Sequence, residues 1–248
     1  EDPVSPCVAT VDKVASPTRL MLGETTRITL TLEASCPADE APIDVMLVLD
    51  SSASMADGGK LANATAAARA FVDAMHLDPS RVGLVVFNED AGVRQRLTSD
   101  GAVIRSSLSG LIAGGRTNVS QAIEVARAHL AEVGDPARTQ AIIVLTDGRN
   151  TVSGAEPIPE AAARAKADGV LVATFCAGGQ CDPDLEPAAS SRDLYFNVTD
   201  VSQLAALYAT LAGTLQQNAL RTLTVRDVLP PNMYFLGGTG RPEPDTVA

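Results

Sequence analysis

One carboxylate and two hydroxyl groups follow an apolar segment at close, regular spacing. Residues 43–49 are apolar except for Asp44, a length that suits one buried strand, and the next residue is Asp50. Ser52 and Ser54 stand at the second and fourth positions after Asp50. Oxygen ligands grouped so closely after a buried strand favour binding of a hard cation. The alternative is helix capping, because Ser, Thr and Asp are favoured immediately before helices.

Two more oxygen-bearing side chains stand where a parallel sheet would bring them to the same edge. Asp147 follows the apolar segment 141–146, and Thr117 lies in the glycine-led loop 114–118, just before a predicted helix. Ligands of open α/β sheets bind beyond the carboxyl ends of the strands, and Mg²⁺ takes about six oxygens in near-octahedral geometry. We therefore expect Asp147 and Thr117 to complete the ligand set. Taken singly, each would be an ordinary polar loop residue.

The segments that must position these ligands alternate between strand and helix patterns. Apolar runs predict strands at 44–49, 82–87, 141–146, 171–177 and 194–198, several of them continuous enough for burial on both faces. Helical periods of apolar residues run through 61–75, 119–130 and 204–217. This alternation predicts an α/β fold with a doubly wound, mostly parallel, Rossmann-like sheet that helices cover on both sides.

Both ends of the chain have a different pattern. Residues 26–33 alternate strictly between apolar and polar side chains, and this alternation returns in 221–228. The proline-bearing segment 37–42 precedes the change to the α/β pattern. We therefore predict an α/β domain at 43–217, inserted into a small all-β sandwich formed by residues 1–42 and 218–248.

The two ends supply fewer strands than the roughly 7 of an immunoglobulin-like sandwich. One explanation is that the sequence is a processed or trimmed fragment, which also fits a chain that begins at Glu1 without an apolar leader. The other is that a neighbouring chain donates a strand to the open edge by β-augmentation. The second explanation predicts self-assembly into a polymer.

The cysteine spacing matches neither a zinc site nor a redox Cys-x-x-Cys motif. If the predicted strands 8–14 and 26–34 form a hairpin, the first cysteine lies beside the second, and the last two flank a glycine-bearing loop. Two such local disulfides indicate an oxidising compartment and hence an extracellular chain. The alternative is four buried thiols in a cytosolic protein. The four residues are Cys7, Cys36, Cys176 and Cys181.

Charge and composition exclude several classes of partner. The formal net charge is −11, the sequence pI is about 4.6, and the chain has only three lysines. Because no basic stripe is present to neutralise phosphates, we expect neither nucleic acid nor an anionic membrane surface as a partner. No apolar stretch approaches the ~18 residues of a membrane span, so direct membrane insertion is not expected.

The histidines do not support an enzyme. His76 and His129 have no cysteine or second histidine nearby in the sequence that would make a zinc set, and we expect both to be structural. A hydrolase that used Ser52 or Ser54 would need a positioned base, and no motif supplies one. We therefore expect a binding protein.

Four segments in register resemble the von Willebrand factor type A domain. The resemblance covers roughly residues 43–217, and its segments are Asp44 to Met55, Arg81 to Phe87, Gly114 to Asn118 and Leu145 to Gly148. It implies a metal-ion-dependent adhesion site that comprises Asp50, Ser52, Ser54, Thr117 and Asp147. The ion would be Mg²⁺, with Mn²⁺ or Ca²⁺ as alternatives. The family commonly has glycine where this chain has Ala53.

The resemblance also implies how such a site works. The ion keeps one position for water, and an Asp or Glu carboxylate of a partner protein replaces that water. Residues 225–235 are further similar to a strand and turn of β-sandwich repeats in prokaryotic cell-wall proteins. We therefore expect a secreted or surface-anchored bacterial adhesion module. The alternative is a structural subunit of a surface filament or surface layer, in which the α/β domain is decoration.

Overall fold

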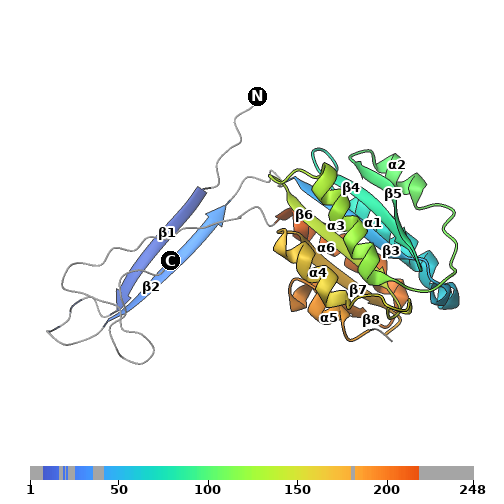
Figure 1. The fold of residues 1–248 in the computed structure, drawn as a ribbon. Helices are drawn as coiled ribbons and strands as arrows, with labels where there is room; N and C mark the ends of the chain where they lie inside the picture. Colours follow the sequence, from blue (N-terminus) through green and yellow to red (C-terminus); the bar gives the residue numbers. More distant parts are fainter. Residues whose placement is uncertain are drawn as a thin grey trace.

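The computed structural model describes residues 8–16, 19, 21, 26–35, 42–179 and 182–217. These residues form a two-stranded sheet and an α/β domain (Figure 1). In the α/β domain, helices lie on both faces of a central sheet. The predicted α/β class is therefore confirmed.

The central sheet has six strands in the order β5-β4-β3-β6-β7-β8. Only β5 is antiparallel to its neighbour, and the other four pairings are parallel. The five predicted strands are all present, within two residues at each end. The strands are β3 (Ile43–Asp50), β4 (Arg81–Phe87), β5 (Ala91–Thr98), β6 (Thr139–Thr146), β7 (Leu171–Ala177) and β8 (Tyr195–Val198).

Strand β5 is the strand of the central sheet that the sequence analysis did not predict; the helices α2, α4 and α5 were not predicted either. It pairs with β4 alone and forms one edge of the sheet. Most of its side chains are exposed or half-buried, and Arg94 and Arg96 interrupt its apolar residues. Charged side chains are common on edge strands because they discourage pairing with other chains. Because they interrupt the apolar residues, such a strand is not recognised as an apolar run.

Side chains of β3 alternate between two cores, which explains why the strand is apolar along its whole length. Leu47 and Leu49 pack with α1 (Lys60–Ala74), α2 (Gly101–Ser107) and α6 (Leu204–Gln217). Met46 and Val48 pack on the opposite face with α3 (Val119–Val133), α4 (Ile158–Ala167) and α5 (Leu185–Ala188). Three short 3-10 helices complete the domain: η1 (Ala53–Gly59), η2 (Arg192–Leu194) and η3 (Val201–Gln203). Among the described residues, no helix is long and apolar enough to cross a membrane.

The carboxylate inside the first apolar run, Asp44, belongs to the opposite end of the sheet from the predicted ligands. Arg81, at the start of the neighbouring strand, donates to both of its oxygens, from Nε over 2.9 Å and from Nη2 over 2.6 Å. The Asp135 N–H donates to Asp44 Oδ2 over 2.9 Å. Asp44 therefore joins β3 and β4 at their starts and is not available to the predicted metal site.

Strands β1 (Val8–Ser16) and β2 (Arg27–Ser35) form the second sheet. They are antiparallel, with Val8 opposite Ser35 and Ser16 opposite Arg27. The predicted hairpin strands are confirmed, whereas outside the α/β domain the described residues show only these two strands and no sandwich. Residues 218–248, Cys7 and Cys36 lie outside the described part of the chain, so the predicted β domain and its first disulfide stay predictions.

Candidate metal centre

Asp50 is the last residue of β3, and its carboxylate is fully buried. One oxygen, Oδ1, accepts from the Ser52 N–H over 2.7 Å. The other, Oδ2, accepts from the Thr146 hydroxyl over 2.5 Å. Thr146 ends the neighbouring strand β6, so it fixes the carboxylate from across the sheet. Sequence reasoning missed Thr146, although its position immediately before Asp147 at a strand end was a usable signal.

The two serine hydroxyls point into the same cluster. Ser52 Oγ lies 3.2 Å from Ser54 Oγ, and Ser54 Oγ donates to Asp147 Oδ1 over 2.7 Å. Ser52 occupies the N-cap position of η1, but its side chain makes no capping hydrogen bond. Helix capping therefore does not explain this serine. Because Ser54 is exposed while Ser52 and Asp147 are buried, the cluster opens to solvent at Ser54.

Thr117 is brought to the cluster by hydrogen bonds of its own backbone. Its N–H donates to Thr151 Oγ1 over 2.8 Å, and its carbonyl accepts from the Thr151 N–H over 2.8 Å. The cap of helix α3 is the next residue, Asn118, which leaves Thr117 outside the helix. A Cβ built on Gly148 would lie 3.9 Å from Thr117 Oγ1 and 3.9 Å from Ser54 Oγ. Both hydroxyls therefore lie close to Gly148, the residue after Asp147.

Backbone hydrogen bonds hold two of these loops together. The Gly114 N–H donates to the Ser51 carbonyl over 2.8 Å, and the Ala53 N–H donates to the Gly115 carbonyl over 3.1 Å. Gly115 has a φ of +79°, in the left-handed region that favours glycine. Among the described residues only glycines have a positive φ, so Ala53 replaces the glycine common in the family without backbone strain.

The structure thus brings all five predicted ligands together at the carboxyl ends of β3 and β6. We call this group of five side chains the oxygen cluster. Its members come from three loops: Asp50, Ser52 and Ser54 follow β3, Thr117 precedes α3, and Asp147 follows β6.

Burial disfavours the charged form of Asp50 in the oxygen cluster. Burial raises the pKa of Asp50 from 3.8 to about 6, hydrogen bonds from Thr146 and Ser52 oppose this rise, and the nearby Asp147 carboxylate adds to it. A cation placed between the two carboxylates would relieve both effects. Two carboxylates and three hydroxyls are hard oxygen ligands, and this donor set fits Mg²⁺, Mn²⁺ or Ca²⁺. The described ranges contain no group of three or more His, Cys, Asp or Glu side chains that could hold a metal, so a metal ion at the oxygen cluster would need hydroxyl ligands as well.

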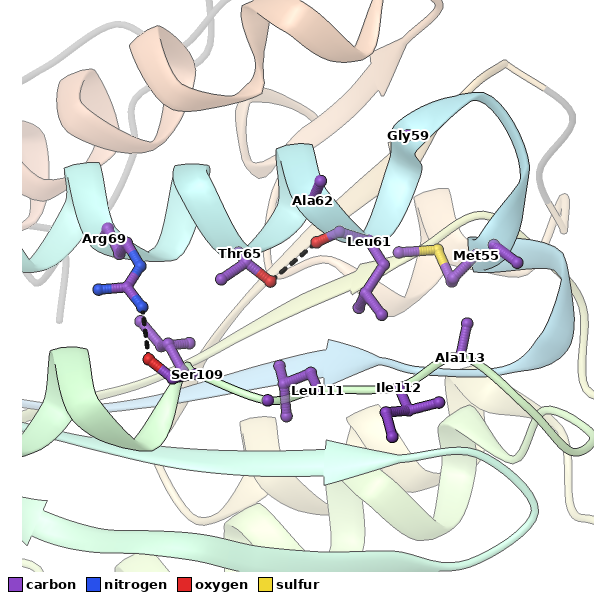
Figure 2. Close-up of a pocket in the computed structure, with 13 residues that line it drawn as sticks. Met55, Gly59, Leu61, Ala62, Thr65, Arg69, Ser109, Leu111, Ile112 and Ala113 are labelled. Atoms are coloured by element: carbon purple, nitrogen blue, oxygen red, sulfur yellow. Dashed lines mark hydrogen bonds between the residues drawn. The ribbon is translucent and has the colours of Figure 1, made fainter.

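An open groove of about 830 Å³ borders the oxygen cluster. It runs between α1 and the segment that precedes Thr117, with mostly apolar side chains such as Leu61, Leu111 and Ile112 (Figure 2). At one end lie Met55 and Ala113, which are adjacent in sequence to Ser54 and Gly114. At the other end, Arg69 donates to Ser109 Oγ over 2.9 Å. The groove therefore leads away from the loops of the oxygen cluster along an apolar surface.

Cys176 in β7 is buried and disulfide-bonded. Cys181, the partner that the sequence analysis expects for it, lies outside the described residues. A disulfide at Cys176 agrees with the expectation of an oxidising compartment, and the pairing itself stays a prediction.

The model of the von Willebrand factor type A domain matches residues 44–210, which is most of the chain and contains the whole oxygen cluster. The chain belongs to the von Willebrand factor type A domain family. No curated protein is similar enough in sequence to match this type A domain chain.

Solved structures with the same fold include adhesive and matrix proteins. The type A domain of the type V pilus tip protein Mfa5 from Porphyromonas gingivalis is 16% identical, with a TM-score of 0.63, and the match covers 75% of this chain and 99% of that one. The pilus adhesin SpaC from Lactobacillus rhamnosus GG is 17% identical, with a TM-score of 0.63, over 88% of this chain and 36% of that one.

Proximal thread matrix protein 1 from the mussel byssus is a third structural neighbour. A form with a zinc-occupied MIDAS motif is 22% identical, with a TM-score of 0.63, over 70% of this chain. The match spans 48% of the mussel protein, so this chain corresponds to about half of it. At these identities the three likenesses establish the fold of this type A domain alone.

Proposed function

We propose that this chain is an extracellular, metal-dependent protein-binding module of the adhesion type. Asp50, Ser52, Ser54, Thr117 and Asp147 are the proposed ligands of one Mg²⁺, and the partner is a protein that presents an Asp or Glu side chain. The single observation that carries the proposal is the oxygen cluster itself, in which three hydroxyls and two carboxylates from three loops converge at one sheet edge.

At the proposed site, residues of the chain would position the two carboxylates, and the ion would bind the carboxylate of the partner. Thr146 and the Ser52 N–H hold the Asp50 carboxylate in place, and the Ser54 hydroxyl holds Asp147. The bound ion would supply a Lewis-acidic position that a carboxylate from outside can occupy. Because the cluster opens at Ser54, that position would face solvent.

The surroundings of the cluster support binding of a protein rather than a chemical step. The groove beside it offers apolar surface to the residues that flank a partner's carboxylate. His129 is engaged elsewhere, because its Nε2 accepts from the Leu97 N–H over 3.3 Å.

The folds of the pilus tip protein Mfa5 and the pilus adhesin SpaC support a bacterial surface location for this chain. We also propose the inserted arrangement, with residues 43–217 between the two parts of a β domain.

The test combines cation titration with a carboxylate probe. Calorimetric titration with Mg²⁺, Mn²⁺ and Ca²⁺ should reveal one saturable site per chain. On the Mn²⁺-loaded protein, acetate should displace metal-bound water and lower the enhancement of water-proton relaxation, whereas the neutral analogue acetamide should not. Absence of saturable cation binding, or equal effects of acetate and acetamide, would contradict the proposal.

A structural subunit of a surface filament is the second proposed function. The described residues outside the α/β domain form a two-stranded antiparallel sheet, and a strand from another chain could extend such a sheet by β-augmentation. The Asp147→Ala variant separates the two functions. Lost acetate binding with unchanged assembly supports adhesion, whereas lost assembly supports the filament subunit.

A further inference from the structure

The Asp147 carboxylate is already paired with a cation from the chain itself. Lys60 Nζ lies 2.6 Å from Asp147 Oδ2, and this contact joins residues 87 positions apart. The Asp147 side chain is 1% exposed and the Lys60 side chain is 24% exposed. Ion pairs between exposed side chains contribute little to stability. This pair differs from them, because the lysine is three-quarters buried and its partner carboxylate is buried.

Lys60 is positioned by the backbone on both sides. It is the first residue of α1 and follows Gly58 and Gly59, whose φ angles of +59° and +70° turn the chain into the helix. Its stem lies against Gly178 in the loop after β7, where a Cβ would approach Lys60 Cε to 3.1 Å. The ammonium group is therefore directed at the oxygen cluster rather than at solvent.

The two oxygens of Asp147 have different partners. Oδ1 accepts from the Ser54 hydroxyl, and Oδ2 accepts from the Lys60 ammonium. With a divalent ion present, the two ionised carboxylates of the cluster would sum with it to zero charge, and Lys60 would leave an excess of +1. An ammonium in contact with one ligand repels a metal ion nearby, and the same positive charge attracts an external carboxylate.

We propose that Lys60 is the internal counter-ion of this site: it neutralises Asp147 in the metal-free protein, weakens the affinity for divalent cations, and strengthens the affinity of the metal-loaded site for a carboxylate. This inference depends on the proposed metal site. Lys60 would position Asp147 and set the net charge of the site. Its positive charge would lower the affinity for the divalent cation and raise the affinity of the metal-loaded site for a carboxylate.

The central experiment uses Lys60→Met, which removes the charge and keeps the length of the side chain. The Mn²⁺ dissociation constant, from calorimetry, should fall about tenfold in this variant. The acetate dissociation constant of the Mn²⁺-loaded protein, from water-proton relaxation, should rise about tenfold. Opposite changes in the two constants are the diagnostic result, because simple structural damage to the site would weaken both.

Three further variants control the comparison. Lys60→Arg keeps the charge and should stay within about threefold of wild type in both constants. Lys166→Met removes a lysine that donates to the Pro187 and Ala189 carbonyls, away from the oxygen cluster, and should change neither constant. If Lys60→Met fails to fold without metal, Lys60→Gln keeps a hydrogen-bond donor for Asp147 Oδ2 and takes its place.

The outcomes separate this inference from the proposed function. Unchanged or weaker Mn²⁺ binding by Lys60→Met and Lys60→Gln would overturn the role of Lys60, even if wild-type protein binds Mn²⁺ and acetate normally. Wild-type protein that binds Mn²⁺ but not acetate would contradict the proposed function, while tighter Mn²⁺ binding by Lys60→Met would still support the metal-affinity role of Lys60. If neither protein binds Mn²⁺, both proposals fail.

Discussion

Ser54 and Asp147 are 93 positions apart in the chain, and one hydrogen bond of 2.7 Å joins the Ser54 hydroxyl to Asp147 Oδ1. This bond connects the loop after β3 to the loop after β6. The two strands are neighbours in the sheet, so their ends deliver both side chains to one place. The oxygen cluster therefore forms because β3 and β6 are neighbours in the sheet.

Thr117 supplies one hydroxyl to the cluster, and its removal should affect metal binding alone. Thr117→Val keeps the shape of the side chain and leaves both backbone hydrogen bonds to Thr151 in place. We expect the Mn²⁺ dissociation constant to rise at least about tenfold, while the free energy of unfolding without metal changes by less than about 1 kcal/mol. Calorimetry and urea unfolding measure the two quantities. Thr65→Val, at a half-buried position of α1 outside the oxygen cluster, is the matched control, and equal effects of the two variants would refute the assignment.

Asp50 should destabilise the metal-free protein at neutral pH, because its charge is buried. The rise of its pKa from 3.8 to about 6 corresponds to up to about 3 kcal/mol at pH 8. Asp50→Asn removes this charge and should therefore raise the free energy of unfolding without metal, measured in urea with chelator present. The same variant should lose the stabilisation that Mg²⁺ gives to wild type.

The control for that prediction is Asp57→Asn, which removes an exposed carboxylate of η1. It should leave both stability and the response to Mg²⁺ unchanged. A metal-free Asp50→Asn protein that is less stable than wild type would show that the Asp50 charge already has a sufficient partner.

His129 should make stability depend on pH. Burial, with a smaller contribution from the positive charge of Arg96, lowers the pKa of His129 below 6.5. The unfolded chain therefore takes up a proton more readily, so stability is fully present above pH 6.5 and is lost as the pH falls toward the pKa of the folded state. His129→Gln keeps an acceptor for the Leu97 N–H and removes the titration.

Urea unfolding of wild type and His129→Gln at several pH values measures this effect. The stability of wild type relative to the variant should be larger at pH 7.5 than at pH 5.5. A difference that does not change with pH would exclude His129 as the source.

Tyr208 in α6 has a buried hydroxyl that finds no hydrogen-bond partner in the described part of the chain. Its ring packs against Phe175, with centroids 4.4 Å apart, and against the edge of Phe71 at 6.2 Å. Tyr208→Phe keeps these contacts and removes the unpaired group, so the free energy of unfolding should rise by about 1 kcal/mol. Thermal unfolding checks this, with the half-buried Tyr195→Phe as the control; a lower melting temperature for Tyr208→Phe would mean that its hydroxyl is bonded.

The α/β domain and the five candidate members of the oxygen cluster could be predicted from the sequence. Burial on both faces requires a continuous apolar run, so β3, β6 and β7 are visible as such runs. Ligands of such sheets lie at the carboxyl ends of strands, so the polar residues that end those runs were identifiable by position. The same reasoning failed for β5, because an exposed edge strand needs no apolar run.

Which polar side chains contact one another depends on the tertiary structure. Thr146 donates a hydrogen bond to Asp50, which is 96 positions away in the chain, and Lys60 donates one to Asp147, which is 87 positions away. Neither contact can be predicted from the local periodicity of the sequence. The first depends on β3 and β6 being neighbours in the sheet, and the second depends on how the glycines before α1 turn the chain. Periodicity records which residues are buried, whereas the order of the strands and the geometry of the loops select the partners of each polar group. That is why the proposed ligands could be predicted from the sequence, whereas the contact between Lys60 and Asp147 could not.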